Sequence, residues 1–268
     1  VSRSRIEGET PIHLSYPTRK SDGSFRSAFE EEYRGRLKRE LLSLVPEAVS
    51  LYAEYRHGDE WPNAFPFRDV ENVLLYNLCA HSLALPSRTS LRRVEDPSLG
   101  ACQKVTYEVG KVEEIAGNRR PAVSAHVTLS KAHFRGPLPL WLEFKRYIQN
   151  QQSWPVVSGD FDVMLSLRAP SSFRLTVERF KKLLDSFIAA LHFRKACPPE
   201  LERRLPTEAV NLVTSPKGAC LGEWEVPQAR GLNGLTWSPA DHRLRACSAN
   251  VTLHEQRGIE VIAHVYGC

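Results

Sequence analysis

Two acidic side chains near residue 70 have the spacing and chemistry of a divalent-metal site. Asp69 and Glu71 stand in the stretch RDVENVLLYN, at the start of a segment in which apolar residues recur with helical spacing. Carboxylate oxygens are hard ligands that suit Mg²⁺, and bound Mg²⁺ aligns a water and a phosphodiester for hydrolysis. Asp69 and Glu71 are therefore the candidate metal ligands, and a divalent metal such as Mg²⁺ is the candidate cofactor.

The same stretch is similar to the Asp-x-Asp-Asn-x-x-Lys element of RusA-type Holliday-junction resolvases. In this chain Glu71 replaces the second aspartate, and Leu75 or Tyr76 stands where that family has lysine. The resemblance covers this short stretch and implies acidic groups that hold magnesium for phosphodiester cleavage. The alternative interpretation is a helix whose first turn carries acids that favour the helix dipole.

A second acid–base pair lies in the stretch PLPLWLEFKRY. Read as a strand, this stretch places Glu143 and Lys145 on one face, because side chains two apart share a face of a strand. This Glu-x-Lys pair resembles the motif with which many restriction-type nucleases hold a metal and a water, and Asp96 is the candidate upstream acid. The alternative is a salt-bridged pair on a strand surface.

A histidine in a repeated hexapeptide marks the third candidate site. SAHVTL near the middle of the chain recurs as SANVTL near its end, with His126 replaced by Asn250. HVTL resembles the His-x-Thr-hydrophobic signature of the two-histidine phosphoesterases, whose pseudo-symmetric halves each supply one histidine. Asn250 departs from that pattern, because an amide cannot serve as general acid or base. Asp241 and His242, just before the second copy, are further catalytic candidates for a small-molecule enzyme that uses His126.

Pairs of arginines precede both copies of the hexapeptide. Arg119 and Arg120 stand before the first copy, and Arg243 and Arg245 before the second. Guanidinium groups suit phosphate oxygens, so these four residues are the predicted nucleic-acid contacts. The chain carries 36 Lys and Arg against 31 Asp and Glu, a formal charge of +5. That balance permits an anionic partner without requiring one.

The order of the predicted helices and strands that would carry these residues indicates an internal duplication. The segments GACQKVTYEV (100–109) and GACLGEWEV (218–226) precede the two hexapeptides at similar spacing. Each half then reads strand, helix, strand, strand, strand. We therefore expect an α+β fold with an internal duplication of a β-α-β-β-β unit. Its sheets should be mainly antiparallel, with one amphipathic helix per unit and an additional N-terminal helix.

Domain boundaries and element positions follow from this interpretation. We expect an N-terminal extension with an amphipathic helix at 1–47, a first α+β unit at 48–148, a linker at 149–160 and a second α+β unit at 161–268. Apolar residues three and four apart predict helices in FRSAFEEEYRGRLKRELLSLV, RDVENVLLYNLCAHSLAL and RLTVERFKKLLDSFIAALHF. Strands are expected in AVSLYAEYRHG, LPLWLEFKRYI, FDVMLSLRA and IEVIAHVYG.

Composition narrows the class of protein. Hydrophobic residues at 42% and charged residues at 25% are ordinary for a globular domain. No apolar run approaches the roughly 20 residues of a membrane span, and the first residues lack the apolar stretch of a secretory signal. The six cysteines include no CxxC pair. We expect a cytoplasmic protein with reduced thiols and no membrane contact.

Three functions remain open from the sequence. The leading hypothesis is a protein that binds nucleic acid, DNA or RNA, either without cleaving it or as a metal-dependent nuclease. The second is a non-catalytic interaction module that presents the duplicated sheet to a protein partner. The third is a small-molecule or phosphoesterase-type enzyme that uses His126. The sequence does not decide whether the protein is an enzyme.

Overall fold

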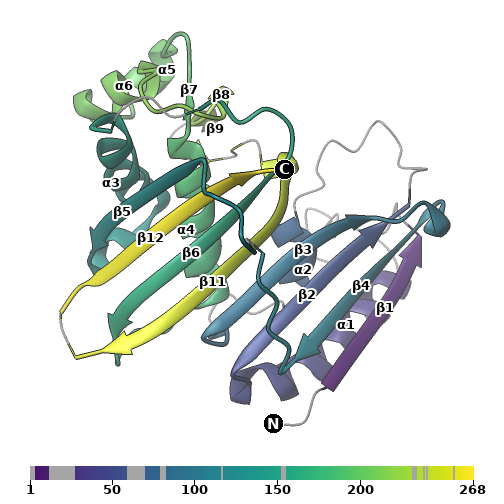
Figure 1. The fold of residues 1–268 in the computed structure, drawn as a ribbon. Coiled ribbons are helices and arrows are strands. Elements are labelled where there is room, and N and C mark those ends of the chain that lie inside the picture. The colour runs from purple at the N-terminus through teal and green to yellow at the C-terminus, as the bar shows by residue number, and fades with distance from the viewer. Residues whose placement is uncertain are drawn as a thin grey trace. The chain divides into compact units, whose positions relative to one another are not determined.

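The chain folds as a mixed α and β protein with a large mixed sheet and several helices (Figure 1). The computed structural model describes residues 4–11, 28–58, 70–78, 83–115, 117–151, 155–230, 234–237, 239, 241–255 and 257–268. Contacts divide the chain into two compact units. Unit 1 comprises residues 1–115, 174–177 and 245–250, and unit 2 comprises residues 116–173, 178–244 and 251–268. None of the helices in the described ranges is both long and apolar enough to cross a membrane.

The sheet of unit 1 has its N-terminal strand at one edge. Its order is β1 (Ser4–Pro11), β4 (Cys102–Val109), β2 (Ser50–His57), β3 (Arg88–Glu95) and then residues 245–250 of β11 (Leu244–His254). β2 and β3 run parallel, and the other neighbouring pairs run antiparallel. Every residue of β2 except Arg56 is buried, which is typical of a strand covered on both faces.

Two helices pack against one another in unit 1. α1 (Ala28–Leu44) also contacts β1, and α2 (Val70–Leu78) also contacts β2 and β3. Leu37 and Leu41, four residues apart on α1, are fully buried, as are Val70 and Leu74 on α2. Both helices confirm the sequence-based prediction, because the spacing of their apolar residues places one stripe against the sheet.

The strands of unit 2 form an antiparallel arrangement in the order β6 (Phe161–Pro170), β12 (Ile259–Gly267) and β5 (Val123–Leu129). Alternate residues of each strand are buried, for example Val163, Leu165 and Leu167 on β6. The intervening residues, such as Ser124 and His126 on β5, face the other way and are less buried. This alternation is the pattern expected when one face of a sheet packs on a core.

Helices α3 (Pro137–Gln149) and α4 (Val177–Ala190) supply the apolar cover of unit 2. α3 contacts β5, and the Phe144 and Phe187 rings of the two helices lie 5.1 Å apart. The predicted apolar face of α4 is confirmed: Phe180, Leu183 and Phe187 are fully buried.

The predicted strand over LPLWLEFKRYI is wrong, because this segment is helix α3. Gly136 lies in an extended conformation immediately before it, and Pro137 begins the helix. Proline is pre-organised for the first helical position. The buried side chains Leu140, Trp141, Phe144, Lys145 and Ile148 recur three and four apart, which is a helical period and not a strand period.

Between α4 and β11, unit 2 holds a series of short elements. They are β7 (His192–Phe193), α5 (Pro199–Glu202), α6 (Thr207–Thr214), β8 (Gly222–Glu223), β9 (Gln228–Arg230) and β10 (Gly234–Thr236). β7 pairs in parallel with β8, and β9 pairs antiparallel with β10. Short 3₁₀ turns complete the fold at Val45–Glu47, Pro97–Leu99, Lys131–Arg135 and Asp241–Arg243.

The two Gly-Ala-Cys segments have different structural settings. The first leads directly into the eight-residue strand β4, whereas the second lies in a turn before the two-residue strand β8. Gly218 has φ of +72°, and a Cβ there would lie 2.2 Å from Ile148 Cγ2. The second segment is therefore shaped by a tight turn against α3, and within it only the two-residue strand β8 forms.

The two hexapeptides both lie in strands. SAHVTL lies in β5 of unit 2, and SANVTL lies in β11, whose residues 245–250 belong to unit 1 and 251–254 to unit 2. Unit 1 includes β1 and α1, which the sequence analysis placed in a separate extension, and unit 2 begins before α3. The compact units thus differ from the predicted boundaries.

Candidate functional site

The predicted metal ligands are only partly within the described structure. Asp69 and the side chain of Asp241 lie outside the described residues. Glu71 is in the first turn of α2 and is fully buried. Within the residues that the structure describes, no three His, Cys, Asp or Glu side chains form a group that could hold a metal ion. The metal-dependent nuclease hypothesis stays a prediction from the sequence.

Glu143 and Lys145 do not share a face. Two residues apart on a helix, they point in different directions. Glu143 pairs with Arg146 at 2.7 Å at the surface. Lys145 is fully buried, and its Nζ donates to the carbonyl oxygens of Ala190 at 3.1 Å and His192 at 2.6 Å. Burial lowers the pKa of Lys145 to about 8, because a low-dielectric setting disfavours the ammonium form.

Two of the four predicted nucleic-acid arginines are engaged inside unit 2. Arg119 pairs at 2.5 Å with the fully buried carboxylate of Asp162 and lies over the Tyr266 ring. Arg243 donates to the carbonyl oxygens of Gly159 at 2.7 Å and Val157 at 2.8 Å. These contacts hold the chain around β6 together, which gives both arginines a structural role.

The other two arginines differ in exposure. Arg120 is exposed in the segment before β5, in unit 2. Arg245 is half-buried on β11, in the part of that strand that belongs to unit 1. The predicted phosphate contact of these four arginines stays a prediction from the sequence.

The candidate histidines lie in two places. His126 is exposed on β5, opposite Ile262 of β12. On the same strands, Ser124 Oγ and His264 Nδ1 are 2.7 Å apart, a hydrogen-bond distance. Burial lowers the pKa of His264, which favours a neutral imidazole near pH 7. His242 instead packs against Trp224, with ring centroids 5.4 Å apart.

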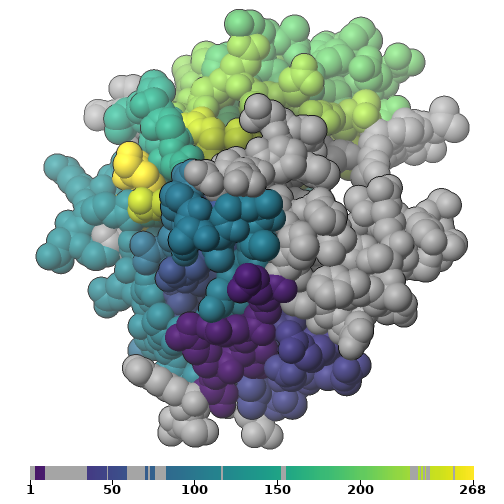
Figure 2. Space-filling model, turned by 90° about the vertical axis from the view of Figure 1, so that its right-hand side faces the viewer, coloured from purple at the N-terminus to yellow at the C-terminus, as the bar shows by residue number. Residues whose placement is uncertain are grey.

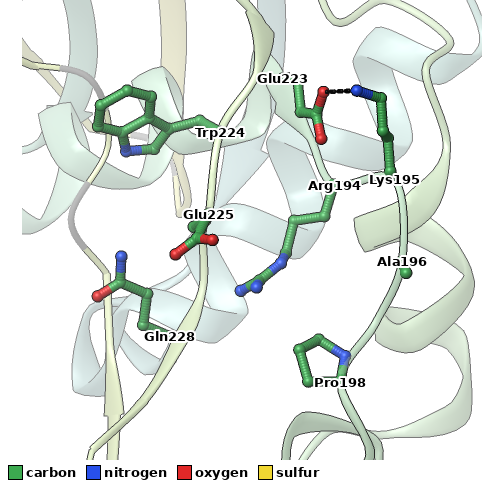
Figure 3. Close-up of a pocket in the computed structure, with 8 residues that line it drawn as sticks. All are labelled: Arg194, Lys195, Ala196, Pro198, Glu223, Trp224, Glu225 and Gln228. Carbon is green, nitrogen blue, oxygen red and sulfur yellow. Dashed lines mark ion pairs between the residues drawn. The ribbon is translucent and has the colours of Figure 1, made fainter.

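A pocket in unit 2 brings polar and aromatic side chains together. It has a volume of about 640 Å³ and is lined by Arg194, Lys195, Ala196, Pro198, Glu223, Trp224, Glu225 and Gln228 (Figure 3). Volumes of this size fit small ligands. The Trp224 side chain is 37% exposed, which is uncommon for so large an apolar group. In Figure 2 the green region of α5 and α6, the same part of unit 2, lies at the surface.

Two segments far apart in sequence position the pocket. The main-chain N–H of Trp224 donates to Phe193 O at 2.9 Å, beyond the β7–β8 pair. Arg194 is held at both ends: its main-chain N–H donates to Val213 O at 2.9 Å, and its Nη1 donates to Pro227 O at 2.6 Å. The guanidinium group consequently lies between the two walls with further N–H donors available.

Two of the four charged side chains that line the pocket form an ion pair with one another. Lys195 Nζ and Glu223 lie 2.7 Å apart (Figure 3). Arg194 and Glu225 are the remaining charged side chains of the lining. The pocket therefore offers a cationic donor, an anionic acceptor, the Gln228 amide and an aromatic surface.

The Trp224 ring is supported from the interior by imidazoles. The His192 ring lies 6.2 Å from the Trp224 ring, and the His242 ring lies 5.4 Å from it. Burial lowers the pKa of His192 to about 3, so its ring is neutral at pH 7. A neutral, buried ring adds apolar contact and no positive charge beside the indole.

The pocket is not among the sites predicted from the sequence. Its two walls are about thirty residues apart in the chain, and they are brought together by the β7–β8 pairing and by the hydrogen bonds from Trp224 to Phe193 and from Arg194 to Pro227. The available signal was the stretch GEWEVPQAR, in which a tryptophan stands between two glutamates near a proline. No protein-family model, curated protein or solved structure matches the chain.

Proposed function

We propose that the protein binds single-stranded nucleic acid, with one nucleotide unit held in the pocket of unit 2. The observation that carries the proposal is that a partly exposed tryptophan, Trp224, and the guanidinium group of Arg194 line the same pocket of about 640 Å³. An aromatic platform with a nearby cation is how many proteins bind single strands, by base stacking and phosphate contact.

The distribution of charge supports an anionic partner for unit 2. Its residues include 18 Lys and Arg and 13 Asp and Glu, which accounts for the whole formal charge of +5. Unit 1 has 18 Lys and Arg and 18 Asp and Glu, so its formal charge is zero. A net positive unit attracts polyanions over a Debye length and raises their rate of association.

Trp224 and Arg194 have separate tasks in this proposal. The indole offers a flat apolar surface on which any base can stack, a contact worth about 1–3 kcal/mol. Arg194 is fixed by its bond to Pro227 O and donates its remaining N–H groups to a phosphate oxygen. Because the side chain is already ordered, little rotamer freedom is lost on binding.

Fluorescence anisotropy with a labelled uridine-rich 12-mer tests the proposal. We expect measurable binding at low salt that weakens steeply as salt is added. Trp224→Ala should weaken binding about 5- to 150-fold, the range that corresponds to one lost stacking contact. The matched control is Lys217→Ala, which removes an exposed charge elsewhere in unit 2 and should change binding less than about 3-fold.

Two outcomes contradict the proposal. One is the absence of binding at low salt for both RNA and DNA oligonucleotides. The other is equal weakening by Trp224→Ala and Lys217→Ala, which would assign the binding to net charge and not to the pocket.

We also propose that the two units arose by duplication, in a register different from the one expected from the repeated hexapeptides. Support comes from comparing each unit by itself. In unit 1 the strand before α1 pairs with β4, and β4 pairs with β2. In unit 2 the strand before α3 pairs with β12, and β12 pairs with β6. All four pairs are antiparallel, and a helix follows the second strand in each unit.

A further inference from the structure

One side chain of the pocket does not fit simple phosphate binding. Glu225 is an exposed carboxylate in a lining that also holds Arg194, and a carboxylate repels phosphate. We propose that Glu225 and Gln228 select guanine as the base held in the pocket. This inference rests on the proposed function and names the base that it prefers.

The polar groups of Glu225 and Gln228 are available to a ligand. Neither side chain makes a hydrogen bond or ion pair with another residue in the described part of the chain. Glu223, one residue before Trp224, differs because Lys195 neutralises it at 2.7 Å. Gln228 is partly buried, so a ligand that satisfies its amide gains a hydrogen bond largely shielded from water.

The position of these groups suits a base that stacks on the indole. Figure 3 shows Glu225 next to Trp224 in the segment that follows β8, Gln228 on β9, and the Arg194 guanidinium reaching toward them from the opposite wall. A base on Trp224 would therefore present its edge to an acceptor from Glu225 and to the amide of Gln228. The sugar–phosphate would lie toward the two basic side chains of the opposite wall.

The chemistry of a carboxylate then distinguishes the bases. An ionised carboxylate only accepts hydrogen bonds, through two oxygens side by side. Guanine presents two adjacent donors, N1–H and the N2 amino group, which match this pair of acceptors. Adenine and cytosine place a ring-nitrogen acceptor beside their amino group, and uracil places its N–H between two carbonyl oxygens. Those lone pairs are repelled by the carboxylate, which disfavours the three other bases.

Gln228 completes the recognition. Its amide carries both donors and an acceptor, and its N–H₂ can donate to guanine O6, an acceptor that adenine lacks. A ligand that leaves the partly buried amide of Gln228 unpaired is disfavoured. A bidentate contact of this kind is worth about 5- to 150-fold in discrimination.

Labelled heptamers of uridine with one central variable base test the selectivity by anisotropy. The central base is guanine, adenine, cytosine or inosine, and inosine lacks only the N2 amino group of guanine. We expect the guanine heptamer to bind about 10-fold more tightly than the adenine and cytosine heptamers, with inosine between them. Glu225→Gln should abolish the guanine preference, and Glu223→Gln, which changes a paired carboxylate, should retain it.

The outcomes separate the two proposals. If all four heptamers bind equally and Trp224→Ala weakens them alike, base selection is overturned and single-strand binding stands. Retention of the full guanine preference in Glu225→Gln also overturns the inference. If no heptamer binds, both proposals fail.

Discussion

At the scale of single residues, Lys145 illustrates how burial changes what a side chain can do. Its Nζ is fully enclosed and donates to the last carbonyl of α4 and to the carbonyl of His192. Cations at the C-terminal end of a helix interact favourably with its dipole. The lysine that sequence analysis placed in a catalytic pair is therefore a cap of α4.

The lowered pKa of Lys145 predicts a pH dependence of stability. The folded pKa is about 8, below the ordinary value of 10.5. Between these values the unfolded chain holds the proton and the folded chain does not, so the free energy of unfolding rises with pH. We expect urea unfolding to show this rise from pH 8 to 10 in the wild type relative to Lys145→Met.

The comparison between variants isolates Lys145 together with its electrostatic coupling to the Cys220 thiol. Burial raises the pKa of Cys220 to about 12, which lowers stability as pH rises above 9 in both proteins. Lys217→Met, which alters an exposed lysine, should keep the wild-type profile. Identical profiles for the wild type and Lys145→Met would show that Lys145 titrates normally in the folded protein.

Arg119 and Arg243 show which part of a site a sequence can predict. Their positions just before the two hexapeptides were visible in the sequence, but their partners were not. Asp162 and the carbonyls of Val157 and Gly159 are distant in the chain. A buried carboxylate needs a cationic partner, and that need outweighs exposure of the arginine to a ligand.

At the scale of elements, a close approach of two main-chain segments fixes the end of β2 against the start of β4. Gly58 N–H donates to Cys102 O at 3.1 Å. A Cβ on Gly58 would lie 1.7 Å from Gly100 O, a contact with main chain that no rotamer change relieves.

Gly58→Ala is therefore expected to destabilise the protein by several kcal/mol, at least about 2. Gly136→Ala is the matched control, because a Cβ there has no atom within 4 Å and its φ of −163° is extended. It should change stability by less than about 0.5 kcal/mol. Thermal or urea unfolding measures both, and equal stability of the two variants would contradict the close packing.

Element types were predicted correctly where the spacing of apolar residues clearly followed either the helical or the strand period. The apolar stripe of α4 identified it correctly as a helix, and the alternation of apolar and polar residues identified β6 and β12 correctly as strands. α3 was misread because its short apolar stretch satisfies either period when its neighbours are unknown. The small strands β7 and β8 had no signal of their own, since each is two residues long and depends on pairing with the other.

At the scale of the whole molecule, the sequence predicted a mixed α and β fold and its net charge, but not where the charge lies. The two units could be separated only from contacts, since each contains residues from distant parts of the chain. Residues 174–177 and 245–250 return to unit 1 after the chain has entered unit 2. Local sequence patterns do not indicate that a segment late in the chain belongs to the first unit.

The central claim is that the pocket of unit 2 contacts the bases of a bound single strand. Photo-crosslinking with an oligonucleotide that contains 4-thiouridine, followed by mass mapping of the labelled peptides, tests it most directly. We predict crosslinks in the peptides that contain residues 194–198 and 223–228, with a yield that falls several-fold in Trp224→Ala. Crosslinks confined to peptides of unit 1, or an unchanged yield at the pocket in Trp224→Ala, would contradict the claim.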